Sequence, residues 1–273
     1  MNAAPTPTGR TDLATIAARY ARAPGERWAP VPEALDHAIA ADAELAEACV
    51  WARRNLLAEA SRRLGGLVGR EVLARYAAAL LAVPRERFVL PDDLAISADD
   101  APAPLDAEGL STVSAPHAYL LSYGLLGLGE GDHLVELGTG TGYGAALASH
   151  IVGPEGRVTS IEIDPELQAR AARLLAEPHA RGPAPMTLLC GDARELAPGV
   201  LAAAPRDALV EVTVTYALAE APDWLLAALP DGARLVAPVG RSEEDQILVR
   251  WSRDRGTTRR SVHGSVRYVA ERR

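Results

Sequence analysis

A glycine-rich turn between an apolar run and a helix is the part of this sequence best suited to hold a small molecule. Residues 134–137 are apolar apart from Glu136, residues 138–144 contain four glycines, and residues 145–151 have a helical pattern. Free backbone N–H groups at such a turn can donate to a ligand, and glycines let that ligand approach the backbone closely. The structural alternative is a tight turn between a strand and a helix that binds nothing.

The glycine spacing fits two classes of cofactor. Counted from Gly140, it gives G-x-G-x-x-A with Glu162 about 20 residues later, which is the pattern of dinucleotide-binding folds. Counted from Gly138, it gives acidic-x-G-x-G-x-G, which resembles the S-adenosylmethionine loop of Rossmann-like methyltransferases. Glu136 favours the second class, because a carboxylate there can orient the amino group of a cationic sulfonium ligand and would repel a pyrophosphate.

Acidic residues also lie at the ends of two later apolar runs. Ligands in an open parallel sheet bind beyond the carboxyl ends of the strands. Glu162 can accept hydrogen bonds there from two ribose hydroxyls, and Asp192 can accept one from an adenine amino group. Asp164 and Asp192 also suit the N-cap of the helix that follows each strand. The predicted cofactor contacts in these turns are Glu136, Gly138, Thr139, Gly140, Gly142, Glu162, Asp192 and Ala193.

The elements that must position these residues alternate between strand and helix. This alternation predicts a mainly parallel α/β sheet of seven strands with helices on both faces. The last two strands have only the turn signal Asp254-Arg255-Gly256 between them and should pair antiparallel at one edge. The predicted strands are residues 134–137, 157–163, 186–190, 208–215, 233–239, 246–251 and 265–270, with helices at 145–151, 165–176 and 222–229.

The first part of the chain has a different, Ala-rich pattern. Helices are predicted at residues 11–22 and 33–64, with Gly65-Gly66 ending the second, and at 70–83. Residues 91–110 are acidic and contain several prolines, which indicates an ordered loop. The predicted domains are a helical N-terminal extension, residues 1–69, and an S-adenosylmethionine-dependent methyltransferase domain, residues 70–273.

Composition and charge exclude several classes of function. The formal net charge of −8 argues against broad binding to nucleic acid or to an anionic membrane. Residues 250–273 are locally basic, but their alternation with Val and Tyr is typical of a solvated strand face. Cys49 and Cys190 form no metal or redox motif, and we predict no metal site. No signal-peptide pattern or membrane-spanning apolar run is present, so we expect a cytoplasmic protein.

A second polar motif, Ser-Thr-Val-Ser-Ala-Pro-His at residues 111–117, precedes the glycine turn by one helix. A helix start alone would explain Ser114 as the N-cap and Pro116 in the first turn. It would not explain Thr112 or His117, so these side chains are candidates for a binding or catalytic role.

From about Arg70 onward, the chain resembles the protein-L-isoaspartate O-methyltransferase family. The Ser-Ala-Pro-His block is the specific match, and residues 83–89, 136–144, 191–192 and 232–240 also match. The resemblance implies a Rossmann-like fold, S-adenosylmethionine as cofactor, and methyl transfer to an Asp or isoAsp carboxylate of a peptide or protein. It also implies that Ser114 contacts the substrate carboxylate and that Thr112, Val113, Tyr119 and Gln246 lie at the cofactor.

The chain departs from this family in two places. After the fourth strand the family has a turn of Ala and Gly leading to a Pro, whereas residues 211–217 here are bulkier and the proline comes at Pro222. The residues before about Arg53 are additional, and they either grip a substrate or only pack on the core. Relatives that methylate an aspartate in ribosomally made peptides, leading to aspartimide, fit this description, so a dedicated precursor peptide is a candidate partner. The candidate substrate contacts are Ser114, His117, Thr213, Thr215 and Tyr216, of which the last three also suit a strand.

Methyl transfer to a carboxylate needs no general base, because a group with a pKa of about 4 is already ionised at neutral pH. The rate must come from alignment of the reacting atoms and exclusion of water. We predict that the hydroxyls of Ser114 and Thr112 hold one carboxylate oxygen while the other attacks, and that His117 shapes the pocket. The alternatives are a small-molecule acceptor, a non-catalytic cofactor-binding scaffold and, disfavoured by Glu136, a dehydrogenase.

Overall fold

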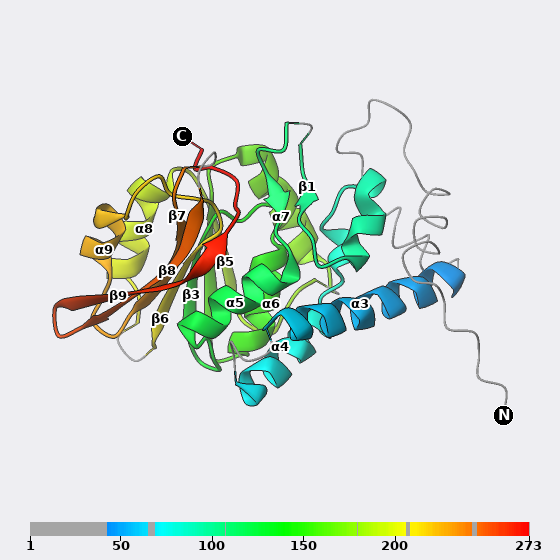
Figure 1. Ribbon diagram of the computed structural model, residues 1–273, viewed down its shortest axis with the longest axis horizontal. Helices are drawn as coiled ribbons and strands as arrows, with labels where there is room; N and C mark the ends of the chain where they lie inside the picture. The colour runs from blue at the N-terminus through cyan, green and yellow to red at the C-terminus, as the bar shows by residue number, and fades with distance from the viewer. Residues whose placement is uncertain are drawn as a thin grey trace.

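The computed structural model describes residues 43–64, 69–106, 108–178, 180–205, 208–241 and 245–272, so the predicted helix at 11–22 lies outside the described residues. A seven-stranded sheet occupies the centre of the described chain (Figure 1). Its strands are β3 (His133–Leu137), β4 (Arg157–Glu162), β5 (Met186–Cys190), β6 (Val210–Val214), β7 (Arg234–Val239), β8 (Gln246–Asp254) and β9 (Thr257–Val266). The order is β5-β4-β3-β6-β7-β8-β9, with β5 to β7 parallel and the last two strands antiparallel, as predicted.

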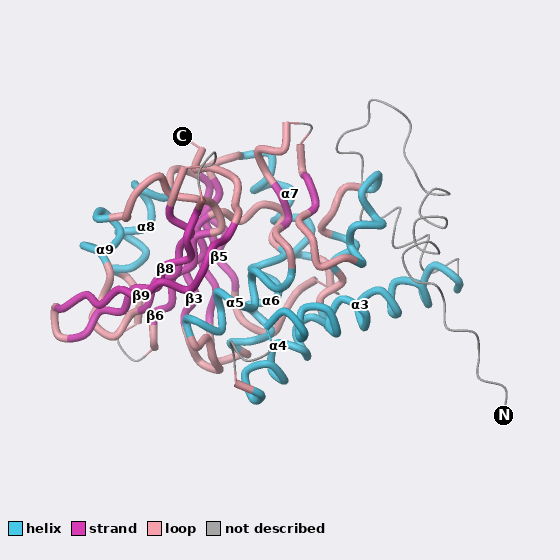
Figure 2. The backbone as a smooth tube through the Cα atoms, viewed as in Figure 1, coloured by secondary structure: helices cyan, strands magenta, loops and turns pink. Residues whose placement is uncertain are grey.

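Helices cover both faces of this sheet (Figure 2). One apolar core contains buried residues of the five helices α3 to α7, and a second core on the other face contains those of α8 and α9. No helix of the described chain has the length and apolar character needed to cross a membrane. The helices are α3 (Ala43–Leu64), α4 (Arg70–Ala82), α5 (Pro116–Leu126), α6 (Tyr143–Val152), α7 (Pro165–Ala176), α8 (Ala193–Ala202) and α9 (Asp223–Ala228), with short 3-10 helices η2 (Arg85–Arg87) and η3 (Pro91–Ala98) and a two-stranded ribbon of β1 (Ala103–Pro104) and β2 (Thr112–Val113).

Three local predictions differ from the structure. The last strand was predicted at residues 265–270, but β9 begins at Thr257, directly after the predicted turn. Nearly all of β9 is exposed, and residues 257–261 contain no apolar side chain that would mark the start of the strand. No bounds were predicted for helix α8, which follows its predicted cap Asp192 and contains Pro198. The acidic segment predicted as a loop contains η3 and β1.

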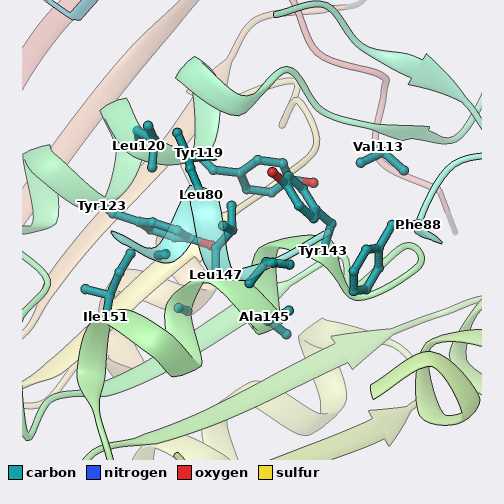
Figure 3. Packing of buried hydrophobic residues seen from close by; sticks show 14 of the residues in the cluster. Leu80, Phe88, Val113, Tyr119, Leu120, Tyr123, Tyr143, Ala145, Leu147 and Ile151 are labelled. Carbon is teal, nitrogen blue, oxygen red and sulfur yellow. The ribbon is translucent and has the colours of Figure 1, made fainter. Parts of the chain in front are cut away.

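A cluster of aromatic side chains packs beside the glycine turn (Figure 3). The Tyr143 ring, in the first turn of α6, lies 5.4 Å from the Phe88 ring and 5.7 Å from the Tyr119 ring, measured between centroids. The Tyr123 hydroxyl donates a hydrogen bond to the Gly144 carbonyl at 2.9 Å. Because Tyr119 and Tyr123 belong to α5, this cluster fixes α5 and the motif before it against the glycine turn.

The described part of the N-terminal extension packs on the same core. Helix α3 contributes buried residues such as Ala52, Ala60 and Leu64 to the core that also holds α4 and α5. Its Arg63 Nε lies 3.0 Å from Asp100 Oδ2. Residues 43–64 therefore stabilise the domain, and the predicted boundary after residue 69 stays a prediction.

The buried His133 at the start of β3 makes stability depend on pH. Its Nε2 lies 2.9 Å from Thr159 Oγ1, and burial, with Arg157 nearby, lowers its pKa to about 4. Between pH 6.5 and 4 the unfolded chain binds a proton that the folded chain does not, so stability falls as the pH falls. Because of His133, we expect the free energy of unfolding to fall by about 2 kcal/mol when the pH is lowered from 7 to 5.

Urea unfolding of the protein and of His133→Asn at both pH values measures this effect. Asn can bond Thr159 but does not titrate, so the difference in unfolding free energy between the two proteins should change by that amount. An unchanged difference would show that His133 titrates normally in the folded chain.

Candidate active site

A narrow cleft opens at the carboxyl ends of β3, β4, β5 and β6. The empty space in the cleft, including its open mouth, is about 770 Å³. The centre of a water molecule fits in only about 70 Å³ of the cleft, because its walls lie close together. Its walls are the glycine turn, residues 110–114, the turn after β6 and residues 269–272. Twelve of the residues predicted for the site line it: Thr112, Val113, Ser114, Tyr119, Gly138, Thr139, Gly140, Glu162, Asp192, Ala193, Thr215 and Tyr216.

The glycine turn adopts a backbone that other residues disfavour. Gly138 has φ +97° and Gly142 has φ +91°, both in the left-handed region. A Cβ at Gly138 would overlap the Thr215 hydroxyl, and one at Gly142 would press on Leu175. Gly142 is the N-cap of α6 and no side chain caps the helix, but Gly142 itself does not line the cleft.

Glu162 is bonded directly to the glycine turn. Its carboxylate accepts the N–H of Gly140 at 2.8 Å and the N–H of Asp164 at 3.1 Å. Burial raises the pKa of Glu162, although both N–H groups act to lower it. The two bonds hold the carboxylate in the wall of the cleft, at the end of β4.

The two aspartates cap the helices that follow their strands. Asp164 accepts the N–H of Glu166 at 2.9 Å and caps α7, as predicted. Asp192 accepts the N–H of Arg194 at 2.8 Å and caps α8. Asp192 also lines the cleft, so its capping role is compatible with the predicted contact to an adenine group.

Glu136 lies behind the glycine turn and does not line the cleft. Its Oε2 accepts a hydrogen bond from the Ser160 hydroxyl at 2.7 Å, and that hydroxyl lies 2.7 Å from Thr139 Oγ1 in the turn. Its other oxygen has no hydrogen-bond partner among the described residues. Burial, and secondarily the charge of Glu162, raises the pKa of Glu136 to about 8. The structure therefore does not place Glu136 where a ligand in the cleft would contact it, and with this raised pKa its carboxyl group is mostly protonated at neutral pH.

The Ser114 segment is held by a buried arginine that the sequence interpretation missed. Arg85 donates to the Ser114 carbonyl at 3.4 Å, and it also donates to the carbonyls of Ile96, Asp99 and Ala101 at 2.8, 2.9 and 2.5 Å. The Ser114 N–H donates to the Tyr119 hydroxyl at 3.3 Å. The N-cap of α5 is Ala115, so the interpretation of Ser114 as the helix cap was wrong. The only signal for Arg85 was its place in the block of residues 83–89 that matches the family.

The turn after β6 forms the wall opposite the Ser114 segment. Thr215 donates its hydroxyl to the Gly138 carbonyl at 2.7 Å, so it supports the glycine turn. Tyr216 lines the cleft beside it, and burial raises the pKa of its hydroxyl. Thr213 is buried within β6 and does not reach the cleft.

Two further predicted contacts lie away from the cleft. His117 Nδ1 lies 2.9 Å from Asp100 Oδ1, and the same oxygen accepts the His117 N–H at 2.9 Å. Gln246 is buried, and its side chain bonds both backbone groups of Tyr268, at 3.0 and 2.7 Å. The structure therefore gives His117 and Gln246 supporting contacts and does not place either side chain where a cofactor or substrate would lie.

Comparison with known proteins agrees with this geometry. The sequence model of the family described as Protein-L-isoaspartate(D-aspartate) O-methyltransferase (PCMT) matches residues 61–272. The chain is 39% identical over 196 residues to a protein-L-isoaspartate O-methyltransferase of Ignicoccus hospitalis, covering 71% of this chain and 83% of the relative. It is 37% identical over 191 residues to protein-L-isoaspartate O-methyltransferase 2 of Archaeoglobus fulgidus, covering 70% and 82%.

Two solved structures share the fold. A structure titled protein-L-isoaspartate O-methyltransferase superposes with a TM-score of 0.65 at 25% identity, covering 80% of this chain and 65% of that one. A putative protein-L-isoaspartate O-methyltransferase from Plasmodium falciparum, solved with S-adenosyl-L-homocysteine, gives a TM-score of 0.60 at 19% identity, covering 80% and 97%. The match of the family model over most of the chain, with the identity to its named members, shows that this chain belongs to the protein-L-isoaspartate O-methyltransferase family.

Proposed function

We propose that this protein transfers a methyl group from S-adenosylmethionine to a carboxylate of an isoaspartyl or aspartyl residue in a peptide or protein. The observation that carries the proposal is that Ser114 and the strand-end residues Gly140, Glu162 and Asp192 line one cleft, although they are far apart in sequence. The named activity of the relatives at 39% and 37% identity supports the same reaction.

The residues of the cleft suit this cofactor. When bound, S-adenosylmethionine supplies a methyl group on a positively charged sulfur. Glu162 and Asp192 offer carboxylate oxygens at adjacent strand ends, where ribose hydroxyls and an adenine amino group can donate to them. The glycine turn lets the amino-acid end of S-adenosylmethionine approach the backbone closely. Hydrogen bonds link the turn residue Thr139 to Ser160, and Ser160 to Glu136.

The substrate carboxylate needs orientation and no proton acceptor. We assign the hydroxyls of Ser114 and Thr112 to hold one of its oxygens while the other faces the methyl group. Ser114 is only 9% exposed and is fixed through its backbone by Arg85 and Tyr119, so its hydroxyl is positioned before substrate arrives. The narrow cleft excludes water, which strengthens these hydrogen bonds.

The turn after β6 points to a restricted set of substrates. Thr215 and Tyr216 stand where the family resemblance implies a small-residue turn, and Tyr216 takes space in the wall of the cleft. This favours a flexible peptide as the substrate. Our more specific proposal is that the substrate is a dedicated precursor peptide. The cytoplasmic location stays a prediction from the sequence.

Matched synthetic peptides that differ only in Asp or isoAsp at one position test the proposal. After incubation with S-adenosylmethionine carrying a labelled methyl group, mass spectrometry should show one added methyl group, and mild base should release the label. Label on nitrogen or carbon, which base does not release, would contradict carboxyl methylation. Labelling of metabolites but of no peptide would replace it with the small-molecule hypothesis, and cofactor binding without turnover of any acceptor would favour a scaffold.

A further inference from the structure

The last described residues, 269–272, cross the mouth of the cleft and all four line it. Their backbone is bonded to the turn after β6, since the Ala217 N–H donates to the Val269 carbonyl at 2.7 Å and the Glu271 N–H donates to the Ala217 carbonyl at 3.0 Å. The residue before this segment, Tyr268, is hydrogen-bonded through its backbone N–H and carbonyl to the Gln246 side chain. This segment is therefore an ordered wall of the cleft, and we call it the closing segment.

Two charged side chains join the closing segment to the opposite rim. Glu271 pairs with Arg194 on α8 through bonds of 2.9 to 3.0 Å that use both carboxylate oxygens. The Arg194 guanidinium in turn lies 5.5 Å from the centre of the Trp224 ring. Arg272 Nη1 lies 3.2 Å from Asp164 Oδ2 and 3.1 Å from Ser111 Oγ. The segment is thus fastened at the starts of α7 and α8 and at the motif that precedes Ser114.

The positions of these two anchors relate them to the cofactor. Asp164 follows Glu162 by two residues, and Arg194 follows Asp192 by two residues. The anchors therefore stand next to the acids assigned above to the ribose and the adenine. The cleft admits water centres in only about 70 Å³, whereas sites for small molecules commonly measure about 300–1,000 Å³. Because residues 269–272 form one wall of this cleft, their displacement would open it to a nucleoside.

We infer that residues 269–272 are a clamp over the nucleoside half of the cofactor, held shut by the pairs Glu271–Arg194 and Arg272–Asp164. Arg272 and Glu271 are positioning residues that slow cofactor exchange. Neither pair uses a side-chain atom of Ser114 or Tyr216, so the clamp is separate from the side chains assigned to the substrate. This inference rests on the proposed function, because it assumes that the cleft binds S-adenosylmethionine.

The test is the rate at which S-adenosylhomocysteine leaves the full chain, measured by stopped-flow displacement. Arg272→Ala and Glu271→Ala should each speed release about tenfold, because each removes a charge-assisted contact. Their KM for the peptide should stay within about twofold. Arg267→Ala removes an exposed arginine just before the closing segment and should release the product at the rate of the unmodified protein. Release equally fast from Arg267→Ala would show that the overall charge of this segment acts, and not the clamp.

Two further measurements separate a clamp from a loss of structure. Exchanging the charges in the double variant Glu271→Arg, Arg194→Glu should restore slow release, which a merely disrupted segment would not do. Raising the salt to 1 M shortens the screening length to about 3 Å, so release should accelerate most in the unmodified protein and less in Arg272→Ala, which keeps only the Glu271–Arg194 pair. If the unmodified protein bound no S-adenosylhomocysteine, the proposed function itself would be wrong. If it bound the product and all variants released it at one rate, only the clamp would be wrong.

Discussion

Replacing Glu162 with Ala is expected to weaken S-adenosylhomocysteine binding at least about 100-fold. Two hydrogen bonds from ribose hydroxyls to a buried carboxylate contribute about 1.5–3 kcal/mol each, and 1.4 kcal/mol is a factor of ten in affinity. The change also removes the acceptor for the N–H groups of Gly140 and Asp164, so the glycine turn loses its support at the same point. Titration calorimetry of the folded variant measures the effect.

Two matched variants make the Glu162 result specific. Glu162→Gln keeps one oxygen acceptor in a side chain of the same shape, so its affinity should fall between those of the unmodified protein and the Ala variant. Glu166→Ala removes an exposed carboxylate in the first turn of α7 and should leave the affinity unchanged. Binding by Glu162→Ala at normal strength, with a normal unfolding curve, would remove Glu162 from the cofactor site.

The parallel part of the fold could be predicted from the sequence because burial on both faces leaves a clear signal. Every residue of β3 and β6 is buried, and both strands have mostly apolar residues, with Glu136 in β3 and Glu211 and Thr213 in β6 among them. β9 gave no such signal, because nearly all of it is exposed and it has only two apolar side chains, Val262 and Val266. Its turn was recognised from Gly256, but the strand itself was placed too late in the chain.

The strand-end residues could be predicted because parallel strands bring their carboxyl ends to one edge. Glu162 and Asp192 could be predicted from their places alone, at the end of β4 and just after β5, and both line the cleft. Residues whose position depends on the direction of one side chain could not be predicted in this way. Gln246 belongs to the strand that was expected, yet its amide turns to the Tyr268 backbone.

Contacts between residues far apart in the sequence could not be predicted either. Arg85 reaches the Ser114 carbonyl across 29 residues of chain, and Arg272 reaches Ser111 across 161. Neither spacing has any period that a local pattern could reveal. The structure therefore adds the supports of the site, while the sequence had already indicated many residues that line it.

Replacing Ser114 with Ala is expected to lower kcat/KM for an isoaspartyl peptide about 100-fold, with binding of S-adenosylhomocysteine within about twofold of the unmodified protein. In the proposed role the hydroxyl holds the reacting carboxylate, and losing one oriented donor in a water-excluded site commonly costs this much. The Ser114 hydroxyl also bonds the Tyr119 hydroxyl, but the backbone bonds from Arg85 and to Tyr119 stay in the variant, so the segment should keep its shape. Steady-state methylation kinetics, with calorimetry for the product, give both quantities.

Ser111 provides the contrast that gives the Ser114 result its meaning. It lies three residues earlier in the same motif, but its hydroxyl accepts from Arg272 of the closing segment. Ser111→Ala should therefore speed product release and leave the chemical step intact, as single-turnover rates would show. Ser114→Ala should do the reverse, with a slow single turnover and normal release. If the two variants had the same kinetic profile, the division between a hydroxyl that orients the substrate and one that retains the cofactor would be wrong.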